Sequence, residues 1–262
     1  MKPSQRDTVA ALAGALLLLG LACNSARAQQ WSGQPFEFSF TPYLWGAWSS
    51  FDVEPKDPAI ASRSGTLDPH QLFSHLTWIP FAGAAELRKG SFGLALDYIH
   101  LPLRAGVHTR DIAFGGGTGG ATQDVGSAIF LYRLYRDDVQ HVDVGGGVRA
   151  WGLSGDISLN QGLLPPVSIA RGDSWADGLA ALRYHREFGN GFGATLYGDI
   201  GAGGASLDWQ GLATLDYKAN SWIDLRAGFR AMGFDYTATR ATLKVSSYGP
   251  ILGATFHFGP YY

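Results

Sequence analysis

Residues 223–232 have the sequence IDLRAGFRAM, in which apolar residues alternate with a second set that is mostly charged. One parity holds Ile223, Leu225, Ala227, Phe229 and Ala231, and the other holds Asp224, Arg226, Gly228, Arg230 and Met232. A period of two residues is that of a β-strand, because successive side chains point to opposite faces. The same alternation recurs in 141–150 and 209–218. The chain therefore contains strands with one apolar face and one face that collects charge.

Ten segments of the chain can be interpreted as strands of this kind. They cover 36–48, 77–89, 91–104, 122–136, 139–155, 172–187, 192–204, 207–218, 221–236 and 243–258. Most exceed the about 5–6 residues typical of globular strands and the ~9–11 residues with which a strand crosses a bilayer. A water-soluble sandwich would alternate in the same way, but with shorter strands. The sequence predicts an all-β fold, a transmembrane antiparallel up-and-down β-barrel of about ten strands, within a range of roughly eight to twelve.

The connections between these segments alternate in length. Four are tight turns rich in Gly, Asn and Asp, at 89–91, 136–138, 189–191 and 219–221. Most of the others are longer, at 49–76, 105–121, 156–171 and 237–242. Bacterial outer-membrane barrels have short turns on the periplasmic side and longer loops outside. We therefore expect both ends of the barrel chain on the short-turn side, facing the periplasm.

Aromatic residues gather near both ends of the predicted strands. Near the long connections lie Trp45, Trp48, Trp78, Trp175 and Trp209. Near the short turns lie Phe36, Phe38, Tyr132, Tyr184, Phe188, Phe192, Tyr217, Trp222 and Phe258. Trp and Tyr favour membrane interfaces because the ring is apolar while its N–H or O–H remains in contact with water. These residues predict two interfacial girdles.

The composition excludes several classes of protein. Of 262 residues, 36 are Gly, 16% are charged and 13% are aromatic. Disordered chains are rich in charge and poor in aromatic residues, and glycine at this frequency disfavours a helical bundle. The formal net charge of −2 gives no sign of a nucleic-acid partner.

The first residues have the pattern of an export signal. The apolar run Val9–Ala22 follows a basic start and is shorter than the ~20 residues of a membrane-spanning helix. Small residues at Ala26 and Ala28 then form a cleavage site for a signal peptidase. A lipoprotein site at Cys23 is disfavoured because Gly20 stands where Leu is expected. We expect 1–28 to be a cleaved secretory signal peptide, 29–262 to be the barrel domain, and the location to be the cell outer membrane.

The end of the chain resembles the last strand of a known class of protein. Apolar residues occupy alternate positions at Leu252, Ala254, Phe256 and Phe258. Tyr262 keeps an aromatic end, although Pro260 interrupts the alternation. In this respect, and in 40–46 and 86–98, the chain is similar to small Gram-negative outer-membrane β-barrel proteins, porin-like or OmpW-like in general pattern. The resemblance implies a monomer surrounded by outer-membrane lipids and lipopolysaccharide, with a C-terminal strand recognised by the insertion machinery.

The charged parity of the strands defines a candidate lumen. Its residues are Glu86, Arg88, Asp97, Arg133, His141, Asp143, Arg149, Asp177, Arg183, Glu187, Asp199, Asp216, Lys218, Asp224, Arg226 and Arg230. Because a barrel of about ten strands has a narrow interior, we expect the two signs to form a network of ion pairs. We expect Asp216 and Asp199 to hold Arg226 and Arg230. Such a network would serve either as a structural plug or as the lining of a narrow, water-filled path for small solutes.

Two alternatives place the function outside the lumen. Asp97 and His100 approach the outer end of one strand, and Asp173, Asp177 and Asp235 lie near other outer ends, as a rim hydrolase would require. The surface segments 49–76 and 105–121 would instead suit a protein that binds a partner. Catalysis is the less favoured alternative, and no cofactor or metal site is expected, because no His, Asp and Glu residues have convincing ligand spacing.

Two local motifs lie in those surface segments. The run Asp68-Pro69-His70-Gln71 predicts the start of a helix, with an acidic N-cap and Pro in the first turn. A short helix there would cover the external mouth or bind a partner. The glycine-rich run 115–120 lacks the Lys-Ser/Thr of a phosphate-binding loop, and is interpreted as a flexible external loop.

Overall fold

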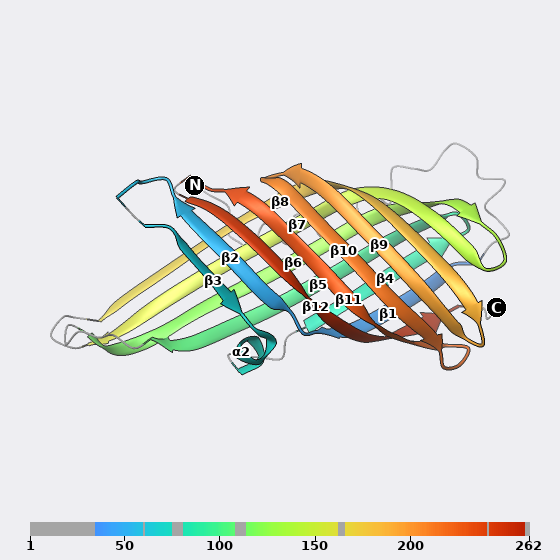
Figure 1. Cartoon of the computed structure of the whole chain (residues 1–262), viewed down its shortest axis with the longest axis horizontal. Coiled ribbons are helices and arrows are strands. Elements are labelled where there is room, and N and C mark those ends of the chain that lie inside the picture. The colour runs from blue at the N-terminus through green and yellow to red at the C-terminus, as the bar shows by residue number, and fades with distance from the viewer. Residues whose placement is uncertain are drawn as a thin grey trace. The chain divides into compact units, whose positions relative to one another are not determined.

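The computed structural model describes residues 35–59, 61–74, 81–107, 114–161, 166–239 and 241–259. From Phe36 onward these residues belong to one compact unit made almost entirely of strands (Figure 1). The expected signal peptide with Ala26 and Ala28, and the terminal Tyr262, lie outside the described residues.

The strands follow one another along the chain with few other elements between them. They are β1 (Glu37–Trp45), β2 (Trp48–Pro55), β3 (Arg63–Leu67), β4 (Phe81–Lys89), β5 (Phe92–Val107), β6 (Phe114–Arg136), β7 (Gln140–Gln161), β8 (Val167–Gly189), β9 (Phe192–Gly203), β10 (Ala205–Lys218), β11 (Ile223–Thr237) and β12 (Ala241–Phe258). Each strand from β4 to β12 pairs antiparallel with the next in sequence.

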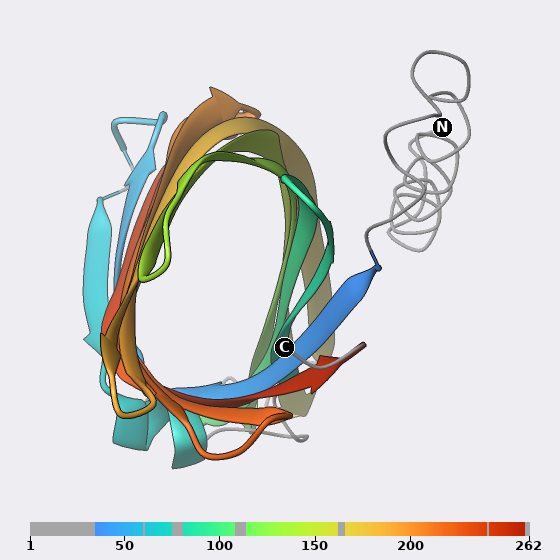
Figure 2. The ribbon, with the colours of Figure 1, turned by 90° about the vertical axis from the view of Figure 1, so that its right-hand side faces the viewer.

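The sheet closes on itself through β1. This strand pairs with β12 on one side, from Phe38 opposite Phe258 to Trp45 opposite Ile251, and with β4 on the other. The closed ring contains ten antiparallel strands, β1 and β4 to β12, which confirms the predicted barrel (Figure 2). β2 continues along the other half of β12, and β3 pairs with β2, so this hairpin lies on the outside of the ring.

Three of the predicted long loops are wrong in their bounds, because strands occupy much of them. Segment 49–76 contains most of β2, all of β3 and the helix α2 (Pro69–Ser74), whose start at Pro69 was predicted. Segments 105–121 and 156–171 are largely taken up by the β5–β6 and β7–β8 hairpins. Ladder hydrogen bonds hold these hairpins together, but their Gly and Ser residues show no apolar alternation, so periodicity could not reveal them. None of the helices among the described residues is long and apolar enough to cross a membrane.

Alternation separates the two faces of the ring as predicted. Large apolar side chains that remain exposed on the outer face include Leu44, Leu96, Phe130, Val148, Leu182, Leu196, Ile200, Leu215, Leu225, Phe229 and Leu252. The residues between them point into the ring, and several charged ones among them, such as Arg149 and Arg230, are almost fully buried. An exposed apolar outer face and a charged interior are the arrangement of a barrel that crosses lipid.

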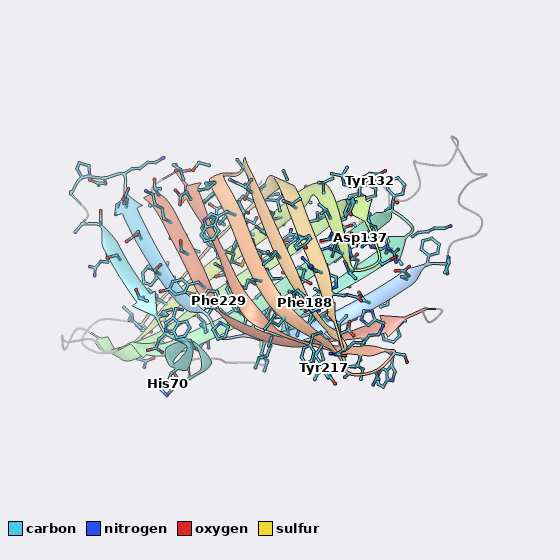
Figure 3. All side chains as sticks on the ribbon, turned by 45° about the vertical axis from the view of Figure 1, so that its right-hand side comes forward. His70, Tyr132, Asp137, Phe188, Tyr217 and Phe229 are labelled. Carbon is cyan, nitrogen blue, oxygen red and sulfur yellow. The ribbon has the colours of Figure 1, made fainter. Side chains whose placement is uncertain are left out.

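The aromatic girdle at the short-turn end is present on the outer face. Phe36, Phe38, Tyr132, Phe188, Phe192, Tyr217, Trp222 and Phe258 are exposed there, and Tyr184 is half-buried. Figure 3 shows Tyr132 and Tyr217 near this end, together with Asp137 of the β6–β7 turn, while His70 of α2 lies toward the other end.

The second predicted girdle is partly wrong. Trp175 is buried inside the ring and Trp45 packs against the same interior cluster. Trp78 lies outside the described residues. The outer face at this level carries Trp48 stacked on Tyr248, with ring centroids 6.2 Å apart, and Phe81 beside Tyr98 at the same separation. Trp175 shares its parity with Asp177, so its side chain points into the ring although it lies near a long connection.

Inward-facing glycines allow the strands to pack closely in a narrow ring. A Cβ atom added at Gly147 would overlap the carbonyl oxygen of Ala128, and one at Gly228 would overlap that of Ala213. The neighbouring strand thus occupies the space that a side chain would need. Glycine enrichment is explained in part by the curvature of the barrel rather than by flexible loops.

The outer face can be tested by placing a charge on it. Leu225 and Phe229 are 49% and 48% exposed on β11, between the two aromatic girdles. We expect Leu225→Arg and Phe229→Arg each to lower the free energy of unfolding by about 2–4 kcal/mol in lipid, because a guanidinium then faces hydrocarbon. Unfolding in phospholipid vesicles measures this loss. The inward-facing Asp224→Asn is the control, and equal tolerance of charge at Leu225 and Phe229 would mean that the two faces are inverted.

Candidate functional site: the charged lumen

The interior of the ring holds three groups of charged side chains, each of which joins strands that are not neighbours in the sheet. The first lies nearest the short turns and consists of Glu86, Arg88, Arg133, Asp143 and Arg183. Arg183 of β8 donates to Glu86 of β4 at 3.0 Å, across the lumen. Two further arginines of this group, Arg88 and Arg133, approach Asp143 to 3.0 and 2.9 Å.

Asp143 is the centre of this first group. Its side chain is 0% exposed and accepts hydrogen bonds from Arg88, Arg133 and Arg183. Three guanidinium groups therefore surround a single buried carboxylate, and Glu86 supplies the second negative charge. Charge-assisted bonds of this kind are the strong ones in protein interiors, because donor and acceptor are both ionised.

The second group surrounds Arg149 of β7. Its guanidinium donates to Asp208 at 2.6 Å, to Asp199 at 2.7 Å and to Ser127 at 2.9 Å. Trp151 donates its indole N–H to the other oxygen of Asp208 at 2.7 Å. Asp208 was missed in the sequence analysis, although it shares the inward parity of Gln210.

The third group crosses the lumen from β11 to β5 and β1. Arg230 donates to Asp97 at 2.8 Å and to the hydroxyl of Tyr43 at 2.6 Å, and Tyr43 in turn donates to Asp97 at 2.8 Å. The side-chain oxygen of Gln210 accepts from Arg230 at 2.7 Å and from Arg149 at 3.1 Å. Gln210 therefore links the second and third groups into one network.

The remaining predicted lumen residues form local contacts. Arg226 lies 3.3 Å from Asp216, as the sequence suggested, and Asp216 accepts the hydroxyls of Thr195 and Thr214. The pairing expected between Arg230 and Asp199 is wrong, because Asp199 is bound by Arg149. Two other acids have further partners: Asp177 accepts the backbone N–H of Ala205 and the indole N–H of Trp175, and Asp224 approaches His257 to 2.8 Å.

An aromatic layer fills the lumen on the long-hairpin side of these charges. Trp151 and Phe234 have ring centroids 4.6 Å apart, Trp175 and Phe234 5.1 Å, and Trp175 and Tyr236 3.9 Å. Ile99, Val125 and Met232 belong to the same buried cluster. This layer was not predicted, although the inward parity of Trp151 and Trp175 indicated it.

The short-turn half of the lumen is hollow. A cavity of about 630 Å³ is lined by charged residues of the first group, by Arg226 and Asp216, and by the turn residues 136–141. Its inner end is formed by Arg149, Arg230 and Gln210. The lumen therefore consists of a polar vestibule, a network of paired charges and an aromatic layer, in that order.

Asp137, in the turn between β6 and β7, lies at the rim of this vestibule. The side chain of Gln140, the backbone N–H groups of Val139 and Gln140, and the hydroxyl of Tyr135 all donate to its carboxylate. The Gln140 amide and these other donors hold the pKa of Asp137 well below its usual range. Its negative charge is thus satisfied within its own turn.

Three residues of the alternative rim hydrolase, Asp97, His100 and Asp173, have separate partners in the structure. Asp97 points into the lumen toward Arg230, whereas His100 approaches Asp124 to 2.7 Å, and Tyr98 donates to the same carboxylate oxygen at 2.8 Å. Asp173 accepts the hydroxyl of Tyr236 at 2.8 Å. Among the residues that the structure describes, no three His, Cys, Asp or Glu side chains form a group that could hold a metal ion.

Comparison with known proteins gives similarity of structure only. No family model and no curated protein sequence matches the chain, so the resemblance to porin-like or OmpW-like barrels stays a prediction. The outer membrane protease OmpT of Escherichia coli aligns with 6% identity and a TM-score of 0.48, covering 89% of this chain and 100% of that one. Ail, the attachment invasion locus protein of Yersinia pestis, in complex with sucrose octasulfate, aligns with 12% identity, a TM-score of 0.36 and coverages of 86% and 99%. The translocator domain of the autotransporter NalP from Neisseria meningitidis aligns with 12% identity and a TM-score of 0.33, covering 95% of this chain and 97% of that one.

The two arginines of β11 give a matched test of the network. The side chain of Arg230 is 2% exposed and that of Arg226 is 32% exposed. We expect Arg230→Ala to cost about 3–5 kcal/mol of unfolding free energy, because Asp97 is left without its cation inside the lumen. Arg226→Ala should cost far less, because the Arg226 side chain is already partly exposed and Asp216 keeps the hydroxyl donors of Thr195 and Thr214. Urea unfolding of both variants in vesicles measures the difference, and equal costs would show that the central network is open to water.

Proposed function

We propose that this protein is an integral outer-membrane β-barrel whose lumen is closed, and that it acts as a structural barrel rather than as an open pore. The observation that carries the proposal is the set of ion pairs across the lumen, Arg183–Glu86, Arg149–Asp208 and Arg230–Asp97. Each joins strands that are separated in the sheet.

The energetics of the network support a plug rather than a conducting path. An ion pair enclosed away from water is stable only when its donors and acceptors are satisfied by each other. Arg149 has two carboxylate partners and an amide partner, and Arg230 has a carboxylate, a phenol and an amide. A solute crossing at this level would have to break several charge-assisted bonds and then pass the layer of Trp151, Trp175 and Phe234.

The faces of the barrel support its proposed surroundings. The exposed apolar band suits lipid, and the girdle at the short-turn end suits an interface. We place the short turns in the periplasm, since β1 begins and β12 ends on the side of the short turns. The outer face of β12 carries Phe258 with Leu252 exposed further along, as expected for a strand offered to the insertion machinery. Outer-membrane lipids and lipopolysaccharide then surround a monomer.

A second candidate function is the binding of a partner by the external hairpin. β3 pairs with β2 and with no other strand among the described residues, so one edge of this short strand is available for pairing. An unpaired edge can add a strand from another chain. This role is compatible with a closed lumen, since the hairpin lies outside the ring.

Planar-bilayer recording tests the closed lumen. We expect the refolded protein to insert and to give no discrete conductance steps in concentrated potassium chloride, because the central network and the aromatic layer leave no continuous water path. The variant Arg149→Ala/Trp151→Ala/Phe234→Ala, whose folding is checked by its heat-dependent shift on a gel, is the opened control and should conduct. Regular conductance steps from the unaltered protein would contradict the proposal and favour a small-solute pore.

A further inference from the structure

One wall of the vestibule, formed by β6, β7 and β8 at the short-turn end, presents arginine and histidine side chains to the cavity. Arg133, Arg183, His141 and His185 all line the cavity, and their side chains retain between 12% and 22% exposure. Two acids pair with these arginines: Asp143 is fully buried behind them, and Glu86 lies across the lumen on β4. The accessible surface of this wall is therefore formed by arginine and histidine side chains.

A break in strand register adds a further cation. The pairing of β6 with β7 shifts between Arg133 and Tyr135, so that Arg133 lies opposite Asp143 while Arg136 lies opposite His141. This irregularity lets Arg133 and Arg136, three positions apart, both line the cavity. Bulges frequently redirect side chains at functional sites. Within the part of the chain that the structure describes, the guanidinium of Arg136 makes no hydrogen bond or ion pair.

Two histidines complete the wall. The rings of His141 and His185 are stacked with centroids 5.0 Å apart, and both line the cavity. His185 shares a hydrogen bond with the hydroxyl of Thr195 at 2.9 Å and lies 3.7 Å from Asp216. The nearest acid to His141 is Asp143, at 4.0 Å.

Most of the acids that also line the vestibule have partners of their own, such as Arg230 for Asp97, Arg226 for Asp216 and His257 for Asp224. Glu86 is bound by Arg183 and Arg88, and Asp137 is bound by the donors of its own turn. Asp138 and Glu187 are exposed. Arg136 is therefore the cation of this wall with unused donors, beside two arginines whose acid partners lie behind or across from them.

We propose that the β6–β8 wall of the vestibule binds a small soluble anion that carries phosphate or carboxylate groups. Arginine donors arranged in forks match such groups, and the pocket is large enough for a small organic anion at about 630 Å³. The inference rests on the proposed closed lumen in one respect, namely that the anion enters and leaves at the short-turn end. Binding at equilibrium does not require conductance. A failed binding test would therefore leave the closed lumen standing, and a conducting barrel would leave the anion site standing.

Titration calorimetry with inorganic pyrophosphate as the probe tests this site. The refolded full-length barrel is kept in a non-ionic detergent at moderate salt. We expect saturable binding by the unaltered protein and a dissociation constant about tenfold higher for Arg136→Gln, since one charged donor group is lost. Arg136→Lys keeps the charge but loses the fork, and should fall between the two. Arg136 is exposed, so these changes should leave the heat-dependent gel shift intact.

Lys218→Gln is the matched control. Lys218 lines the same cavity from β10, and its substitution removes the same single positive charge as Arg136→Gln. Its dissociation constant should change less than about twofold. Equal weakening by Arg136→Gln and Lys218→Gln would overturn the proposal, since it would show general attraction by net charge. No saturable binding by the unaltered protein would also overturn it. Tighter, Arg136-dependent binding of dihexanoyl phosphatidic acid than of pyrophosphate would assign the wall to a lipid headgroup instead and contradict a soluble ligand.

Discussion

The structure depends on the mutual neutralisation of charges inside a narrow ring of strands. Arg149 and Arg230 are buried at the centre, where neither lipid nor bulk water can stabilise a guanidinium. Carboxylates from other strands pair with them, and Gln210 joins the two. Each of these contacts requires the ring to be closed, so tertiary structure and charge pairing stabilise each other. In the proposed closed barrel, the same contacts occlude the passage along the barrel axis.

The aromatic layer and the vestibule follow from this arrangement. On one side of the network Trp151 and Trp175 exclude water, and each donates its indole N–H to an aspartate, so no donor of these two rings is left unsatisfied. On the other side the lumen widens into a cavity whose β6–β8 wall exposes arginines and histidines. The two ends of the barrel are thus chemically different. A ligand approaching from the short-turn end meets charge, whereas one approaching from the other end meets the aromatic layer.

Local sequence features predicted much of the fold and only part of the site. Alternation such as Ile223–Met232 assigned the two faces, and residues such as Asn190 and Gly191 marked the short turns, because both signals lie within a few residues. Partners across the lumen, such as Arg230 and Asp97, are 133 positions apart, and their meeting depends on the number and stagger of the strands. The extended Gly- and Ser-rich hairpins carried no alternation. Trp175 could have been placed in the lumen by its parity with Asp177.

The most direct measurement of the central claim is a double-mutant cycle between Arg230 and Asp97. Unfolding free energies are measured in lipid vesicles for the unaltered protein, Arg230→Gln, Asp97→Asn and the double variant. Direct pairing across the lumen predicts a coupling energy of about 2–3 kcal/mol, because Asp97→Asn leaves the buried Arg230 charge unpaired, Arg230→Gln leaves the partly buried Asp97 charge unpaired, and the second change removes each of them. A coupling energy below about 0.5 kcal/mol would contradict the account, since the two charges would then act independently in a water-filled interior.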